Sequence, residues 1–535
     1  MRNNALKPIT LALLGLGAWG SAVAGETVNL GGGFLLDWRV NTTYTLSQRM
    51  KNPDSILTGF GSGNDGDKNF HKGDLTANRL GILFDGHLRK GDSGFVMSAS
   101  TFYDDVYHNG NANTTAINTP GPVNQFADET QRYHGGYTRL LDAYGYTNFD
   151  IGDQGKLNVR LGRHVVSWGE GLFFGGISLA QGPADGTKQG VAGTEVKDQV
   201  LPEDQLSFTY AVNPDWSIVG HAQYGFHQTI APAPGSFLSA SDSVGPGANC
   251  QQPYVNGRCS FGLRVGDDKP NGTQWGIGTR YRITGETELG LFYLNYHDRT
   301  PSVYTDAMSS ILSGRATYQV GFFDNVKLTG LTLSTSLGMA SLAMEVSYKQ
   351  GAPVLVNAFN PYLSAVLPTP TRADILQTNV NSTINFGRTP LAPQTMFLAE
   401  LAYISISNVE AARVPGTNPL PNLRPTTATD KLTFGSYGFA AGATLSLTYP
   451  GIFEGWDLGV PLSYQYQIGG RTLTGGLGAE GDGRYSVGTN FTYRGNFQIG
   501  VSYSGFLGSP STATDKHQRL FTDRDYVSMT MKYSF

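Results

Sequence analysis

The chain has 535 residues, a formal net charge of −4 and a mean hydropathy of −0.22. After residue 24 no apolar run approaches the roughly 18 residues that a membrane-spanning helix requires, which excludes a helical membrane protein. Charged residues are scarce at 15%, whereas glycine reaches 70 residues and aromatic residues 11%. Since ordinary soluble domains carry about 25% charged residues, this profile favours an exported outer-membrane β-barrel, with a soluble exported all-β protein as the alternative.

The first 24 residues are predicted to be a cleaved signal peptide. Arg2 and Lys7 make a positive start, residues 9–20 form a short apolar run, and residues 22–24 read A-V-A, which is an A-x-A cleavage site. The apolar run is too short for a signal anchor. We therefore expect a single mature domain of residues 25–535, located in the outer membrane of a Gram-negative bacterium.

Segments in which apolar and polar residues alternate recur along the chain. They cover residues 274–283, 342–349, 456–467 and 484–494. The last ten residues, Y-V-S-M-T-M-K-Y-S-F, follow the same pattern and end at Phe535. Because side chains alternate between the two faces of a strand, each segment predicts a strand with one lipid-compatible face and one polar face. A terminal phenylalanine after such a strand is similar to the signal read by the outer-membrane barrel assembly machinery, which we expect as a partner.

The lengths of the links between predicted strands give an independent indication of a barrel. Short links are predicted at residues 90–93, 152–155, 213–215, 284–286, 340–341, 387–393, 450–454 and 494–496. Long segments are predicted at residues 48–75, 107–138, 168–203, 229–272, 299–327, 351–371, 408–434, 470–483 and 505–524. Outer-membrane barrels alternate short periplasmic turns with long outer loops and have an even strand number. We predict an all-β transmembrane barrel of about 18 antiparallel strands, with 16 as the alternative.

The third outer loop, residues 168–203, is predicted to fold into the lumen. It follows an alternating strand over residues 156–166 and opens with S-W-G-E-G-L-F-F-G-G at 167–176. An apolar, glycine-rich loop is poorly placed in water, and no helix follows that would make it a phosphate-binding loop. We expect it to form a plug or constriction whose ligand-contacting residues are Trp168, Glu170, Leu172, Phe173 and Phe174. Glu170 is expected to be held by a lumen arginine such as Arg160 or Arg163.

Arginines predominate among the charges predicted to face the lumen. They are Arg160, Arg280, Arg282, Arg484 and Arg494. Rings of basic residues in a pore favour anions. The alternative is that these groups are neutralised by acidic residues across the barrel wall.

Other motifs carry little chemistry. Cys250 and Cys259 are predicted to form a disulfide that closes a short surface loop. Asn64-Asp65-Gly66-Asp67-Lys68-Asn69 starts like a calcium loop but lacks its turn glycine and its final glutamate, so we favour a solvated polar loop over an irregular cation site. No catalytic, metal or cofactor motif is present, and we expect a protein that is not an enzyme, has no cofactor and binds no nucleic acid.

Three stretches make the chain resemble a known family. They are G-R-H-V-V-S-W-G-E-G-L-F-F-G-G-I-S-L-A-Q at 162–181, G-T-E-V-K at 193–197 and N-D-G-D-K-N-F-H-K-G-D-L-T-A-N-R-L at 64–80. These residues are similar to the domain of unknown function 1302 family of exported proteobacterial proteins, over essentially the whole mature chain. The resemblance implies an outer-membrane barrel that works with a periplasmic lipid-handling protein and an inner-membrane RND-type transporter. It implies no catalytic residues.

The leading functional hypothesis is a barrel in outer-membrane lipid that passes hydrophobic or amphipathic small molecules, with the third loop as its gate. A water-filled, mildly anion-preferring porin for polar solutes is the second hypothesis. A structural or adhesive surface barrel is the third, and conductance and uptake measurements distinguish them.

Overall fold

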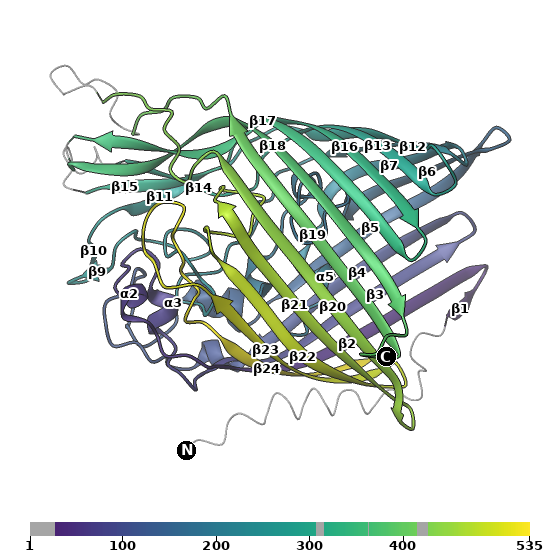
Figure 1. The fold of residues 1–535 in the computed structure, drawn as a ribbon, viewed down its shortest axis with the longest axis horizontal. Helices are drawn as coiled ribbons and strands as arrows, with labels where there is room; N and C mark the ends of the chain where they lie inside the picture. The colour runs from purple at the N-terminus through teal and green to yellow at the C-terminus, as the bar shows by residue number, and fades with distance from the viewer. Residues whose placement is uncertain (1–26, 307–314, 362, 415–425) are drawn as a thin grey trace.

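The computed structural model describes residues 27–306, 315–361, 363–414 and 426–535. The expected signal peptide and its cleavage site lie outside these residues. Each main strand pairs antiparallel with its neighbour along the chain, and β24 pairs with β2, so eighteen strands close into a barrel (Figure 1). The predicted strand number of 18 is therefore confirmed. No described helix is both long enough and apolar enough to cross a membrane.

The barrel strands are β2 (Phe34–Arg49), β3 (Leu75–Lys90), β4 (Ser93–Asp104), β5 (Thr138–Ile151), β6 (Gly155–His164), β7 (Glu203–Asn213), β8 (Trp216–Gln223), β12 (Gln274–Arg282), β13 (Thr287–Tyr296), β16 (Val326–Leu337), β17 (Ala340–Asn360), β18 (Ala365–Gly387), β19 (Gln394–Ser407), β20 (Tyr437–Phe453), β21 (Trp456–Gly470), β22 (Gly483–Tyr493), β23 (Phe497–Leu507) and β24 (Tyr526–Ser534). Outside the barrel wall are β1 (Val28–Gly31), β9 (Tyr254–Val255), β10 (Arg258–Cys259), β11 (Leu263–Asp268), β14 (Ser302–Asp306) and β15 (Thr317–Gly321). The helical turns are α2 (Ser55–Thr58), α3 (Asp65–Lys68), α4 (Asp128–Thr130), α5 (Val196–Gln199), η1 (Asp105–His108), η2 (Gln131–Gly135), η3 (Ser178–Ala180) and η4 (Gly186–Lys188).

The alternation in the sequence sets the two faces of the wall. On β12, Trp275 and Ile277 are exposed on the outer face of the barrel. Gln274, on the lumen face, is fully buried. An apolar outer face and a polar inner face are what a strand in lipid requires. The seam at the C-terminus is closed by Phe535, whose amide donates to the Val40 carbonyl at 2.8 Å.

Each predicted short link falls at or next to a turn between consecutive strands, and together with β1 and the C-terminus these turns lie at one end of the barrel (Figure 1). Two bounds are shifted, because the turn between β16 and β17 is at 338–339 rather than 340–341, and β20 continues to Phe453 through most of 450–454. One predicted loop is wrong. The sequence predicts a long outer loop near residues 351–371, but β17 and β18 continue through most of this segment as a long hairpin, because the apolar alternation persists beyond Gly351. Gly351 has a φ of 73° and marks a shift in register between Lys349 and Ala352. Val356, on this hairpin, is buried and bridges to Leu432.

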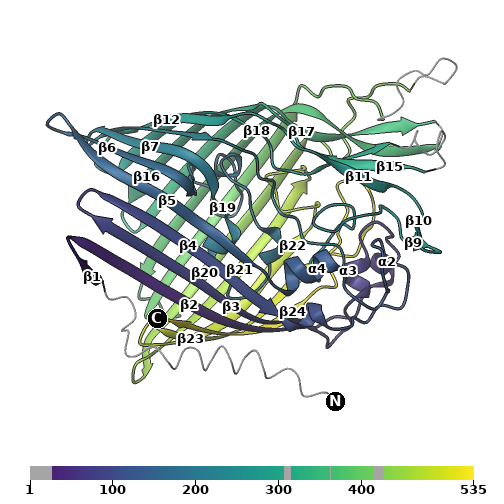
Figure 2. The same ribbon diagram turned by 180° about the vertical axis from the view of Figure 1, so that it is seen from behind.

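The long loops gather into a cap at the other end of the barrel, on the right in Figure 2. A small sheet of β11, β15 and β14 and the helices α2 and α3 belong to this cap. The predicted disulfide between Cys250 and Cys259 is present and encloses the hairpin of β9 and β10.

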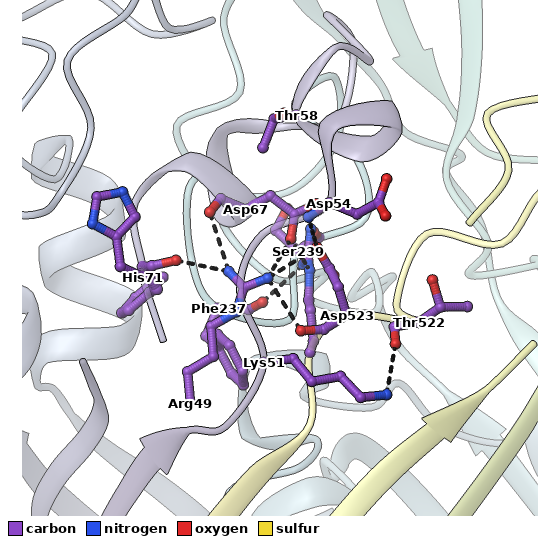
Figure 3. Close-up of polar contacts among 12 residues, drawn as sticks. Arg49, Lys51, Asp54, Thr58, Asp67, His71, Phe237, Ser239, Thr522 and Asp523 are labelled. Atoms are coloured by element: carbon purple, nitrogen blue, oxygen red, sulfur yellow. Dashed lines mark hydrogen bonds and ion pairs between the residues drawn. The ribbon is translucent and has the colours of Figure 1, made fainter. Parts of the chain in front are cut away.

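A buried ion network ties the cap to the top of the barrel (Figure 3). Arg49, at the end of β2, contacts Asp67 at 3.1 Å and Asp523 at 3.0 Å, and Arg524 contacts Asp67 at 3.0 Å. The favoured prediction of a solvated loop at residues 64–69 is therefore wrong. These residues form the buried helix α3, because the carboxylate of Asp67 is neutralised by two arginines that the loop alone does not contain.

Candidate functional site

The third outer loop, residues 165–202, enters the lumen, as predicted. Its first aromatic residue, Trp168, is buried, stacks on Phe292 with ring centroids 5.5 Å apart and meets the edge of His221 at 4.9 Å. Both partners are lumen-facing residues of the wall, on β13 and β8. Figure 1 shows α5, in the second half of the loop, within the outline of the barrel. We call residues 168–177 the plug segment.

Two glutamates of the wall hold the plug segment by its backbone. Glu345, on β17, accepts hydrogen bonds from the amides of Glu170 at 2.8 Å and Ile177 at 2.6 Å. Glu400, on β19, accepts from the amides of Leu172 at 3.0 Å, Phe173, and Phe174 at 3.2 Å. Both carboxylates belong to residues that are 1% exposed. Hydrogen bonds to a buried carboxylate are among the stronger ones in proteins, so the two glutamates fix the plug.

Amide side chains of β18 complete the attachment. Asn381 donates to the Glu170 carbonyl at 2.5 Å, and Gln377 donates to the Gly175 carbonyl at 3.1 Å. Asn379 lies between them and donates to Glu400 at 2.9 Å and to the Phe174 carbonyl. Side chains of three neighbouring strands thus bind five amides and three carbonyls of the plug backbone.

The glycines of the motif are explained by close approach to the wall. A Cβ atom at Gly176 would collide with the carboxylate of Glu345, so only glycine lets the plug reach this acceptor. The wall has a matching position: a Cβ atom at Gly442, on β20, would come within 2.8 Å of the Phe173 ring. The apolar plug residues therefore lie directly against the barrel backbone.

The predicted partner of Glu170 is wrong. Arg163 faces outward and forms an ion pair with Asp204 at 2.9 Å, and Arg160 donates to Asn158 at 3.1 Å. In the described part of the chain neither arginine has a hydrogen bond or ion pair with the plug segment. Burial raises the pKa of Glu170, and its most favourable electrostatic contact is with Arg280. The carboxylate of Glu170 makes no hydrogen bond among the described residues, so its backbone rather than its charge anchors the loop.

The second half of the loop is held by ion pairs that the sequence did not reveal. Lys197 contacts Asp142 at 2.8 Å and also Asp85, both on the wall. Lys532, on β24, contacts Glu195. The loop is thereby connected to strands on several sides of the barrel.

A cavity of about 600 Å³ lies between the plug and the wall of β21–β24. Phe173 and Phe174 line it from the plug, and Arg484 lines it from β22. Phe506 and Phe521, whose rings stack with centroids 5.7 Å apart, line it as well. Two predicted contact residues and one predicted lumen arginine therefore meet at one site. Trp168, Glu170 and the exposed Leu172 do not line this cavity.

The remaining predicted arginines are dispersed. Arg160 lines a separate cavity of about 620 Å³ nearer the turn end, together with Asp37, Asp85 and His87. Arg280 faces Glu288 at 3.7 Å. Arg282 is exposed at the end of β12. Arg494 is not on the wall, because it lies in the turn after β22 with a φ of 47°. These positions do not form the predicted basic ring.

Among the residues that the structure describes, no group of three or more His, Cys, Asp or Glu side chains is arranged to hold a metal ion.

Comparison with known proteins places this arrangement in a family. Residues 6–535 match the family model described as "Protein of unknown function (DUF1302)". No curated protein sequence matches the chain. Acinetobacter baumannii OccAB1 is similar in structure, with 10% identity, a TM-score of 0.43 and coverage of 96% of this chain and 99% of that one. Pseudomonas aeruginosa OccD3 (OpdP) has 10% identity, a TM-score of 0.41 and coverage of 96% and 93%. Pseudomonas aeruginosa OccK2 (OpdF), solved with glucuronate, has 8% identity, a TM-score of 0.39 and coverage of 94% and 98%.

Proposed function

The chain belongs to the DUF1302 family, whose description assigns no activity, and we propose that it is an outer-membrane channel for hydrophobic or amphipathic small molecules. The plug segment is its gate. The partners proposed for the channel are the periplasmic lipid-handling protein and the inner-membrane RND-type transporter that the family resemblance implies, and such partners suit an apolar cargo, which dissolves poorly in the aqueous periplasm.

The observation that carries this proposal is the cavity beside the plug. Its lining is mixed. Phe173 and Phe174 on the plug, Leu238 and Leu477 on outer loops and Phe506 on the wall supply apolar surface, and about as much polar surface comes from residues such as Gln465 and Ser463. Ligand sites are typically concave and measure about 300–1,000 Å³, and a lining with both kinds of surface suits an amphipathic molecule. The pairing of Arg280 with Glu288 also weakens the anion-preferring alternative.

The test compares conductance with uptake. Purified protein in planar bilayers is expected to give small or no steady conductance, because the plug is anchored at both glutamates. A deletion strain complemented with the wild-type chain is expected to take up a panel of long-chain and aromatic carbon sources faster than the strain with empty vector. Large open conductance steps together with unchanged uptake would instead identify a porin. A change in gel mobility on boiling verifies that each sample contains a folded barrel.

A further inference from the structure

The cavity beside the plug contains one charged group without a counter-ion. Arg484 is the only charged residue among those that line it. Its guanidinium makes no hydrogen bond or ion pair with any described residue, and its nearest aromatic contact is Phe521, at 5.9 Å from the ring centroid. Asp482 attracts it from two residues away, but that carboxylate accepts from the Ala479 amide at 2.8 Å and lies beyond ion-pair distance.

The guanidinium of Arg484 is half-buried beside apolar surface, and partial loss of its water favours an accompanying anion. Removing a charge from water without a partner carries a large penalty. Elsewhere in the cap the same cost is met by carboxylates, as Asp67 shows with Arg49 and Arg524. Near Arg484 the lining supplies none, so the donors of this half-buried guanidinium are free to bind an oxyanion of a ligand.

The polar and apolar parts of the lining are separated. Register places Arg484 beside Gln465, and Ser486 beside Ser463, on the lumen face of β21 and β22. The plug phenylalanines and the loop residues supply the apolar remainder. A ligand that satisfies both parts has a charged end at the wall and a hydrocarbon body against the plug.

We propose that this cavity binds a single-chain amphiphile with an oxyanion headgroup, which lies on Arg484 while its chain packs against Phe173 and Phe174. The inference rests on the proposed function and names its substrate class. A carboxylate or phosphate suits the planar fork of an arginine, which can donate two parallel hydrogen bonds. Gln465 and the two serines are within the same lining and supply further donors.

The experiment measures binding of two probes of equal chain length, dodecanoate and dodecanol, to the full-length protein in lipid nanodiscs. Wild-type protein is expected to bind dodecanoate at least tenfold more tightly than dodecanol. Arg484→Gln is expected to weaken dodecanoate binding by tenfold to a hundredfold and to leave dodecanol unchanged, whereas Arg484→Lys has an intermediate effect. Arg494→Gln is the matched control, since that arginine lies in a turn outside the cavity, and it is expected to behave as wild type.

The outcomes distinguish the headgroup assignment from the proposed function as an apolar channel. Equal affinity for both probes, with no effect of Arg484→Gln, overturns the headgroup assignment and leaves the apolar channel standing. Failure of wild-type protein to bind either probe, with no change in uptake by Phe173→Ala, overturns both. Dodecyl phosphate in the same assay tells a preference for phosphate from one for carboxylate. Gel mobility before and after boiling shows that every variant is folded.

Discussion

The attachment of the plug to Glu400 is the feature whose removal should change the channel most. Glu400→Gln keeps the volume of the side chain but replaces one acceptor oxygen with a donor that faces the amides of the plug. The wild-type oxygen Oε2 accepts from three successive amides, those of Leu172, Phe173 and Phe174. Hydrogen bonds to charged groups contribute about 1.5–3 kcal/mol each, so loss of even two of the three weakens docking of the plug by about 3–6 kcal/mol. That corresponds to an increase of at least about a hundredfold in the population of the released plug.

Two measurements check this expectation. Planar bilayers should show larger and more frequent openings for Glu400→Gln than for wild type. A cysteine placed at Phe174, which is 4% exposed, should react faster with a membrane-impermeant maleimide in the Glu400→Gln background. Asp457→Asn is the control, because that carboxylate also belongs to the wall, on β21, but accepts a hydrogen bond from the Gly451 amide near a turn and, among the described residues, has none from the plug. A folded Glu400→Gln barrel with wild-type conductance and labelling would refute the role assigned to the wall glutamates.

Four further results are expected. Burial lowers the pKa of His134 from 6.5 to about 3, so the contribution of the neutral imidazole to cap stability is complete above pH 6.5 and is lost as pH falls towards 3. By pH 5 the lost stability is about 2 kcal/mol. Proteolysis of the cap should therefore depend less on pH in His134→Gln than in wild type. Asp242 and Asp523, whose pKa burial raises to about 6, oppose this trend equally in both proteins, so the comparison isolates the histidine. Reduction of the Cys250–Cys259 disulfide should destabilise the cap by about 2–3 kcal/mol and speed cleavage between the cysteines, while boiling-dependent gel mobility of the barrel stays the same. Gly442→Ala should push the Phe173 ring out of its seat and weaken amphiphile binding severalfold, whereas Gly459→Ala, where the new Cβ has ordinary contacts, should not. Glu170→Arg should loosen the plug by placing a second cation beside Arg280, and Glu170→Gln should leave conductance near that of wild type, since the carboxylate makes no hydrogen bond among the described residues.

The barrel itself could be predicted because its signals are local. Alternation between two faces and the contrast between short turns and long loops are both properties of consecutive residues. The hairpin beyond Gly351 was missed for the opposite reason. Its buried side chains, such as Val356, pack against the distant segment around Leu432, and a loop and an extended arm look alike until that partner is known.

The buried charges of the cap could not be predicted for a similar reason. Asp65 and Asp67 lie in a stretch whose composition is that of a solvated loop. The burial of Asp67 depends on Arg49, 18 residues away, and on Arg524, which is 457 residues away, whereas Asp65 accepts a hydrogen bond from the Asn118 amide at 2.8 Å. A polar segment becomes part of a core only when its counter-charges arrive from elsewhere in the chain, and a single sequence does not show which arginine meets which aspartate.

For the plug, the residue pattern predicted the location of the loop correctly, whereas the expected pairing of opposite charges predicted the wrong attachment. The apolar glycine-rich motif predicted a loop inside the barrel, and Phe173 and Phe174 do line a cavity there. The attachment, however, differs from the expected ion pair between a loop glutamate and a wall arginine. Acidic side chains of the wall bind backbone amides of the loop, and the carboxylate of Glu170 makes no hydrogen bond among the described residues. Glu345 and Glu400 look like ordinary polar-face residues of their strands, because a backbone donor leaves no trace in the sequence. It follows that the plug is docked from the wall, and that substitutions of Glu345 and Glu400 should release it more than substitutions of Glu170.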